Sequence, residues 1–184
     1  MSKYINGTGL LALLLLFSTV AASAQTTGGN KHDKDDAKQY ELALGAAKQA
    51  LADAEKAQVI NQMDIAMCLN KLAGVYCSKK HYDEAGPLYK RALAISEKAL
   101  GPDHLMVSSI MNNLAGVYFA EGQYAQAEQL YKRVLAIREK TFSPGDPAIT
   151  KGYENIAAVY RKTGRESAAK ELMQHAEAIQ AKKQ

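Results

Sequence analysis

The sequence is poor in the residues from which metal centres and nucleophilic active sites are built. Its 184 residues include only two cysteines and four histidines. The histidines are scattered, with no HExxH pair and no Cys/His cluster, and there is no GxSxG motif or phosphate-binding glycine loop. We therefore expect no catalytic residues, no metal site and no cofactor, and we expect that the protein is not an enzyme.

A disulfide bond within the chain is also excluded by the spacing of its cysteines. Cys68 and Cys77 lie nine residues apart in a segment with a helical pattern. Nine residues of α-helix rise about 13.5 Å and turn about 900°, so the two side chains point to opposite faces, whereas a disulfide needs Cα atoms within about 7 Å. We expect each cysteine to be a small, partly buried apolar residue.

Neither charge nor hydropathy indicates a nucleic-acid-binding or membrane-embedded protein. The formal net charge of +4 (pI ≈ 8.9) is too slight to imply a nucleic-acid partner. The apolar run LLALLLLF, from Leu10 to Phe17, is too short to span a bilayer comfortably. A hydrophobic content of 47% is typical of a globular protein.

The N-terminus has the pattern of a secretory signal peptide. Lys3 precedes the apolar run, and Ala22-Ser23-Ala24 follows it as an A-x-A cleavage site. We predict a signal peptide over residues 1–24, cleavage before Gln25, and export to the periplasm or the medium without stable membrane insertion afterwards. The alternative is an uncleaved membrane anchor. Residues 25–38 are polar and mixed in charge, which predicts a flexible leader.

The rest of the chain repeats itself. LAGVY occurs at 72–76 and at 114–118, and the weaker copy IAAVY at 156–160, so successive copies lie 42 residues apart. When 70–100 is aligned with 112–142, 17 of the 31 positions are identical. A half copy precedes them. The mature chain therefore holds about three and a half copies of one structural unit.

Each unit is expected to be a pair of helices. Leu69, Leu72, Ala73 and Tyr76 follow the spacing i, i+3, i+4, i+7 of one helical face, and the second half of the unit has the same spacing from Ala85 onward. Polar turns separate the helices, and alanines at matching positions allow the two helices to approach closely. One pair cannot bury its apolar face alone, but a stack of pairs can.

The expected organisation is an all-α domain over residues 39–184. Its parts are a half unit at 39–62 and units at about 63–101, 105–143 and 147–182. Two departures stand out. Lys80 replaces the glycine that ends the first helix in later units, and Gly86-Pro87 predicts that the second helix of its unit starts late or bends. The final helix is polar, as a terminal cap requires.

The motif N-N-L-A-x-x-Y-x-x-x-G-x-Y-x-x-A-E-x-L-Y-x-R-x-L-x-I-x-E, at 112–139, resembles the tetratricopeptide repeat in the 42-residue form of kinesin light chain. The resemblance covers about residues 39–180. It implies a right-handed solenoid of helical hairpins whose first helices line a concave groove that binds extended peptides. The groove positions that it implies here are Asn70, Lys71, Asn112, Asn113, Asn155, Lys151, Phe119, Arg161 and Lys162.

The groove hypothesis has a chemical rationale and an alternative. An asparagine amide both donates and accepts, so it can pair with any peptide backbone, and Lys151, Arg161 and Lys162 would favour an acidic segment or a free C-terminal carboxylate. The alternative is that the asparagines bond only to neighbouring helices. We expect a non-enzymatic scaffold that binds a protein or peptide; the alternative is a structural, self-associating component of an envelope or secreted assembly.

Overall fold

The structure is a computed structural model, and it describes residues 32–57 and 61–181. The predicted signal peptide and the first part of the predicted leader lie outside these residues. The chain divides into two units, Met1–Gln39 and Tyr40–Gln184, and the first unit is described only where it forms the start of α2. The repeats belong to the second unit.

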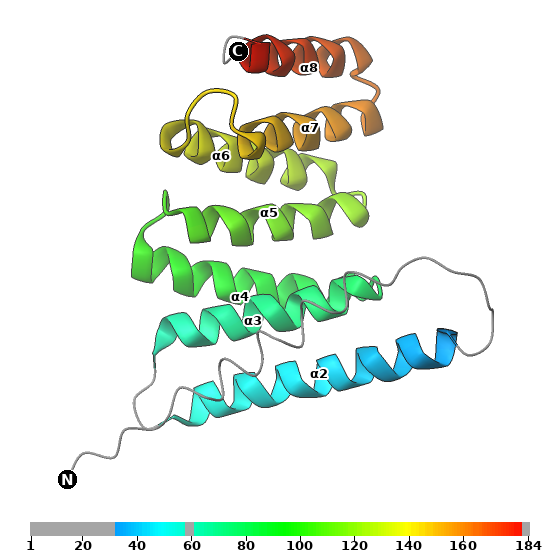
Figure 1. The fold of residues 1–184 in the computed structure, drawn as a ribbon, viewed down its shortest axis with the longest axis vertical. Coiled ribbons are helices and arrows are strands. Elements are labelled where there is room, and N and C mark those ends of the chain that lie inside the picture. The colour runs from blue at the N-terminus through cyan, green and yellow to red at the C-terminus, as the bar shows by residue number, and fades with distance from the viewer. Residues whose placement is uncertain (1–31, 58–60, 182–184) are drawn as a thin grey trace. The chain divides into compact units, whose positions relative to one another are not determined.

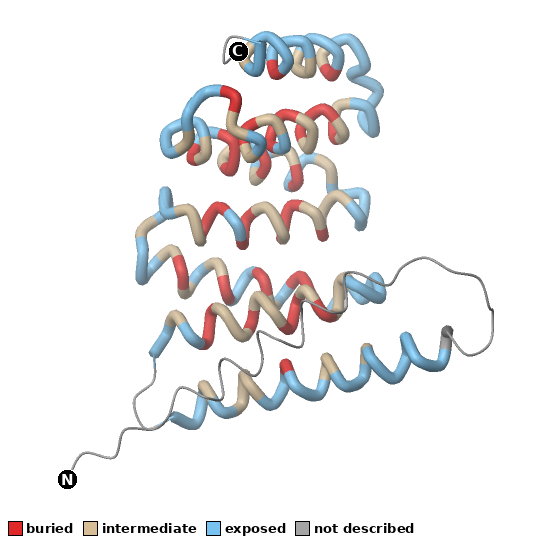
Figure 2. The backbone as a smooth tube through the Cα atoms, viewed as in Figure 1, coloured by how far each residue is buried: buried red, intermediate tan, exposed pale blue. Residues whose placement is uncertain are grey.

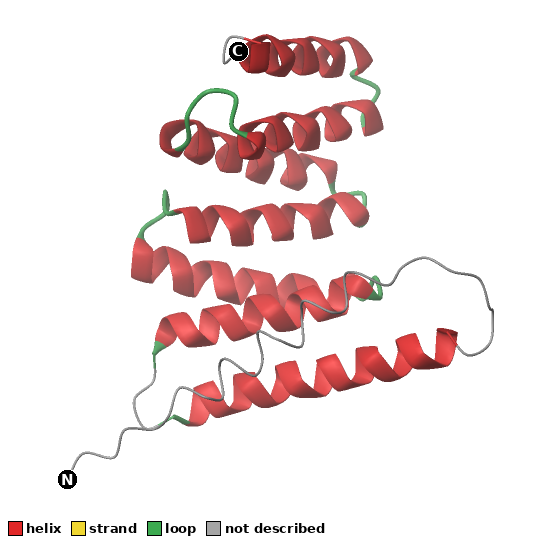
Figure 3. Cartoon of the chain, viewed as in Figure 1, coloured by secondary structure: helices red, strands yellow, loops and turns green. Residues whose placement is uncertain are grey.

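The described residues form helices joined by short loops, and they contain no strand (Figures 1 and 3). This confirms the predicted all-α fold. The helices are α2 His32–Lys56, α3 Gln62–Ser78, α4 Tyr82–Leu100, α5 Leu105–Ala120, α6 Tyr124–Thr141, α7 Pro147–Lys162 and α8 Glu166–Ala181. Helix α2 begins within the segment predicted as a flexible leader, so the leader residues from His32 onward are helical, although those from Lys34 to Gln39 are exposed.

The first helix of each of the three repeats (α3, α5 and α7) is preceded by a residue whose side chain caps the helix N-terminus. The side chains of Asn61, His104 and Asp146 accept hydrogen bonds from backbone N–H groups two residues ahead, at 3.0, 3.1 and 2.8 Å. Pro147 follows Asp146 in the first turn, where its missing N–H costs no helical bond. Asp146 and Pro147 thus form an N-cap and first-turn pair at the start of α7.

The turn between the two helices of each hairpin contains a residue whose backbone is in the left-handed region. Gly122 and Gly164 have φ of 75° and 74°, and Lys80 takes the same place with φ of 62°. A side chain in this region costs about 1–2 kcal/mol relative to glycine. Lys80 is thus a strained substitute for the glycine of the later units.

Of the two alternatives expected for α4, a late start or a bend, the late start is wrong. Helix α4 begins at Tyr82, with Pro87 inside it. The amide of Pro87 would have bonded the carbonyl of Asp83 one turn earlier, so a single helical bond is lost. Both residues are exposed, and water can reach the carbonyl that is left free. One lost bond at the surface is outweighed by the buried face of the same helix.

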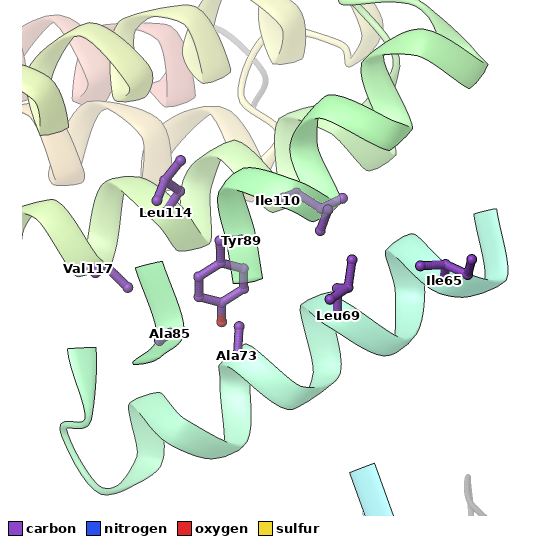
Figure 4. Close-up of a cluster of buried hydrophobic side chains, with 9 residues drawn as sticks. Ile65, Leu69, Ala73, Ala85, Tyr89, Ile110, Leu114 and Val117 are labelled. Carbon is purple, nitrogen blue, oxygen red and sulfur yellow. The ribbon is translucent and has the colours of Figure 1, made fainter. Parts of the chain in front are cut away.

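The core lies between successive helices. Each helix from α3 to α8 packs on the next, and buried positions recur along all of them (Figures 1 and 2). The alanines expected at the closest helix approaches are fully buried: Ala73, Ala85, Ala115, Ala127, Ala157 and Ala169. Between α3, α4 and α5, Tyr89 lies among Leu69, Ile110 and Leu114 in one apolar cluster (Figure 4). Burial of these shared faces holds neighbouring repeats together.

Candidate functional site

The first helices of the repeats are joined by a ladder of asparagines. Asn113 on α5 donates from Nδ2 to Oδ1 of Asn70 on α3, at 3.1 Å. Asn155 on α7 donates in the same way to Asn112 on α5, at 3.0 Å. The four side chains are half-buried. They lie together along α3, α5 and α7, and each bond links two adjacent repeats.

The ladder agrees with the alternative hypothesis, in which the asparagines bond to neighbouring helices. However, each Asn–Asn hydrogen bond, here called a rung, occupies only one N–H and one carbonyl oxygen of the two amides. Within the described residues the NH₂ group of Asn70 and the carbonyl of Asn113 make no other hydrogen bond, and the same holds for Asn112 and Asn155. Each rung therefore leaves one whole NH₂ group and one whole carbonyl group for a further partner.

We expect each rung to stabilise the stack. In a double-mutant cycle of Asn70→Ala and Asn113→Ala, the two changes should couple by about 0.5–1.5 kcal/mol, because they remove one shared hydrogen bond. The free energy of unfolding in urea measures the coupling. Asn70 and Asn155 form the control pair, since they belong to different rungs and their effects should add. Equal coupling in both pairs would argue against the ladder.

The cationic residues predicted for the site do not form one cluster. Lys151, Arg161 and Lys162 all lie on α7, but ten residues of helix separate Lys151 from Arg161 by about 15 Å. Lys151 pairs with Glu154 at 2.9 Å, and Arg161 lies 3.9 Å from Glu166. Lys162 is exposed and has no ion pair within the described residues. Lys151 therefore lies apart from Arg161 and Lys162, and the three charges do not act on one point.

Two further predicted positions differ in their surroundings. Phe119 is half-buried at the end of α5, and its ring meets that of Tyr124 edge-on, with centroids 5.5 Å apart. Lys71 on α3 is half-buried and has no hydrogen bond or ion pair within residues 32–57 and 61–181. Phe119 thus has a structural contact already, whereas Lys71 keeps its donors free.

Sequence reasoning missed a second repeating contact. The ammonium groups of Lys48, Lys90 and Lys132 lie 5.8, 5.4 and 5.8 Å from the ring centroids of Tyr76, Tyr118 and Tyr160. Each pair joins a second helix to the first helix of the next repeat. Lys90 and Lys132 are exposed, yet each lies over a tyrosine ring as a cation–π partner. The lysine and the tyrosine of each pair both recur every 42 residues, and this recurrence could have predicted the contact from the sequence.

Next to the Lys132–Tyr160 pair, the carboxylate of Glu128 on α6 forms ion pairs with two basic side chains. Its carboxylate accepts from Arg165 at 2.5 Å and from Lys132 at 2.7 Å. The guanidinium of Arg165 also lies 4.1 Å from the ring centroid of Tyr160. The hydrogen bond from Arg165, supported by Lys132, holds the pKa of Glu128 at about 2. This network ties α6 to the α7–α8 turn.

The cysteines are not a reactive site. Both lie half-buried on α3 as free thiols, as the spacing predicted. The thiol of Cys68 donates to the backbone carbonyl of Ala50 at 3.6 Å. Burial raises the pKa of both thiols, so neither is poised as a thiolate.

Two kinds of site are not seen in the part of the chain that the structure describes. No group of three or more His, Cys, Asp or Glu side chains there is arranged to hold a metal ion. None of the helices there combines the length and the apolar character needed to cross a membrane.

Comparison with known proteins gives a consistent result. The family model for the tetratricopeptide repeat matches residues 64–140 and 106–182, which together make up more than half of the chain. A solved structure from Podosopora anserina, described as a kinesin light chain with nearly identical TPR-like repeats, is 26% identical and has a TM-score of 0.67. That alignment covers 97% of this chain and 90% of the other.

Other solved structures share the fold at lower identity. BtubC (BKLC) from P. vanneervenii is 22% identical with a TM-score of 0.68, over 95% of this chain and 74% of that one. The apo form of RapI is 16% identical with a TM-score of 0.68, over 96% and 66%. No curated protein sequence matches the chain. These likenesses show a helical-repeat solenoid.

Proposed function

Because this chain belongs to the tetratricopeptide repeat family, we propose that it is a non-enzymatic scaffold that binds an extended segment of another protein along α3, α5 and α7. Proteins of this family typically act as protein-interaction scaffolds, and their fold is generally non-enzymatic. The observation that carries the proposal is the asparagine ladder, because each rung offers an NH₂ group and a carbonyl group that have no partner within the described residues. A peptide backbone presents the complementary pair at every residue.

The charges on α7 suggest which segment binds there. Arg161 and Lys162 lie together at the end of α7, both exposed, and Lys162 has no ion pair within the described residues. A carboxylate beside them would gain charge-assisted hydrogen bonds. We infer that the bound segment carries an acidic side chain or its C-terminal carboxylate at this end, and that its backbone continues along the ladder.

Charge reversal tests this proposal. A partner captured from the exported fraction by the immobilised chain is titrated against the parent and against the Arg161→Glu/Lys162→Glu variant. We expect binding to weaken about 10-fold or more, since one or two charge-assisted bonds become repulsive. The melting temperature should change little, because both side chains are exposed.

Lys170→Glu on α8 is the matched control, since Lys170 is exposed and should leave binding unchanged. Equal affinity of the parent and the double variant would contradict binding at this end of α7. A molecular mass that rises with concentration in size-exclusion chromatography, without any captured partner, would favour the structural, self-associating alternative.

We further propose that the protein is exported. The basis is the sequence of residues 1–24, which combines an apolar run with an A-x-A site. The intact mass of protein recovered from the exported fraction should correspond to a chain that starts at Gln25. Recovery of the full-length mass from membranes would instead indicate an uncleaved anchor.

A further inference from the structure

Helix α2 corresponds to the second helix of a repeat. In the later repeats the first helix covers one face of the second helix, whereas the matching face of α2 is uncovered in the described part of the chain. The 42-residue spacing places Ala43 and Ala50 at the positions of Ala85 and Ala92 on α4. Ala85 and Ala92 are fully buried because α3 packs over them. No first helix precedes α2 in the described part of the chain, and its face is half-buried or exposed. We call it the open face: Leu42 (64% exposed), Ala43, Ala46 and Ala50.

In the described residues, the asparagine ladder also lacks a hydrogen bond at its first repeat, where Lys71 stands at the donor position. In each rung the donor belongs to one repeat and the acceptor to the repeat before it: Asn113 donates to Asn70, and Asn155 donates to Asn112. Lys71 occupies the donor position of the first repeat. It is half-buried and makes no hydrogen bond or ion pair within the described residues. An ammonium group can only donate, and a carboxylate is its strongest acceptor.

The sequence that precedes α2 lacks the apolar residues of a first helix at the matching positions. Gly28 stands at the acceptor position, where it offers no side chain. The residues at the positions of the buried Ile65, Leu69 and Leu72 are the polar Ser23, Thr27 and Asn30. A helix in this register would have no apolar face to place on α2.

A second copy of the chain is also poorly suited. The first helices α3, α5 and α7 already bury their apolar residues within their own stack. The exposed residues of α8 are mainly polar, among them Lys170, Glu171, Gln174 and Glu177. The occupant must therefore bring its own apolar stripe.

We propose that the open face and Lys71 together dock one amphipathic helix of a partner protein, and that this helix carries a carboxylate which pairs with Lys71. The pattern follows from the first helices of this chain. In each of them an apolar residue at position i is followed by the ladder acceptor at i+1, a second apolar residue at i+3 and a small residue at i+4. Helix α7 shows it with an acidic acceptor, in Tyr153-Glu154-x-Ile156-Ala157. This docking surface lies at the end of the stack and is separate from the extended-segment site proposed above.

A synthetic peptide with the sequence of residues 147–162 is the probe, because it has this pattern and carries Glu154. Its fluorescence anisotropy is followed on titration with the intact chain. We expect saturable binding at a single site. Lys71→Glu in the chain, or Glu154→Lys in the peptide, should each weaken binding about 10-fold or more. Combining the two changes should restore much of the affinity, because the ion pair is re-formed with its charges exchanged.

A second variant tests the face independently of the charge. Ala46→Arg puts a long side chain where the helix would lie, and it should abolish binding. Ala178→Arg on the exposed side of α8 is its control and should have no effect. All three positions are exposed or half-buried, so each variant should melt close to the parent, and melting curves check this.

Three results would overturn the proposal. One is the absence of saturation up to about 1 mM peptide. Another is unchanged binding to both the Lys71→Glu and the Ala46→Arg chains, which would put the peptide elsewhere. The third is a concentration-dependent dimer that Ala46→Arg abolishes, which would assign the open face to a second copy. None of these results alters the Arg161→Glu/Lys162→Glu test, so the two proposals fail separately.

Discussion

Removal of residues 166–184 should destabilise the whole domain rather than leave a shorter stable stack. Helix α8 covers α7, and its half-buried Leu172 and Ile179 pack against a cluster that includes Tyr153, Ile156 and Val159. Burying an aliphatic side chain contributes about 1.5–3 kcal/mol. Leu172 and Ile179 are half-buried, but removing α8 also exposes the buried residues of α7 beneath it, so the total loss should be about 3–6 kcal/mol. This is enough to lower the melting temperature by about 10 °C or to cause aggregation.

Thermal unfolding followed by circular dichroism measures this effect. The control is a full-length chain in which exposed residues of α8 are replaced by alanine: Lys170, Glu171 and Gln174. Such surface changes stay within about 0.5 kcal/mol. If the truncated chain melts at the temperature of the parent, the repeats do not depend on their neighbours, and the nearest-neighbour account of the stack is wrong.

The second large effect is expected at Tyr89. Its side chain is 4% exposed and fills the space between α3, α4 and α5 (Figure 4). Tyr89→Ala should cost about 3–5 kcal/mol, because the ring is lost and its neighbours can close the cavity only in part. Helices α3 and α5 would both lose packing, so the variant should unfold at a markedly lower urea concentration.

Tyr89→Phe separates the ring from the hydroxyl. Burial raises the pKa of Tyr89, with a further contribution from the Cys77 thiol, so the hydroxyl stays protonated. Its removal should cost only about 0.5–1.5 kcal/mol. A Tyr89→Ala variant as stable as Tyr89→Phe would show that the ring does not support the stack.

The sequence predicted the elements well because the relevant signals are local. The apolar spacing from Leu69 to Tyr76 lies within two turns of one helix, and it does not depend on what covers that face. The cap at Asp146 and the left-handed turns at Gly122 and Gly164 likewise involve only adjacent residues. The same local reasoning misplaced the start of α4, because it weighed Pro87 without the burial gained by the rest of that helix.

The pairing of polar side chains could not be predicted in the same way. The ladder joins residues 43 positions apart, one more than the repeat of 42, so the acceptor and the donor occupy different places in their units. A comparison of equivalent positions aligns Asn70 with Asn112, and it therefore gives no sign of the bond between Asn70 and Asn113. The offset arises only when neighbouring first helices lie side by side.

By itself, the sequence determined that this chain is a series of helical hairpins with small, buried residues at their contacts, because periodicity and turn chemistry act over a few residues. Only the tertiary structure decided that the asparagines bond to each other, that Lys90 and Lys132 lie over tyrosine rings, and that Leu42 on α2 stays exposed. These contacts join residues that are tens of positions apart. They depend on the distance and rotation between stacked hairpins, which side-chain packing sets and which no local pattern records.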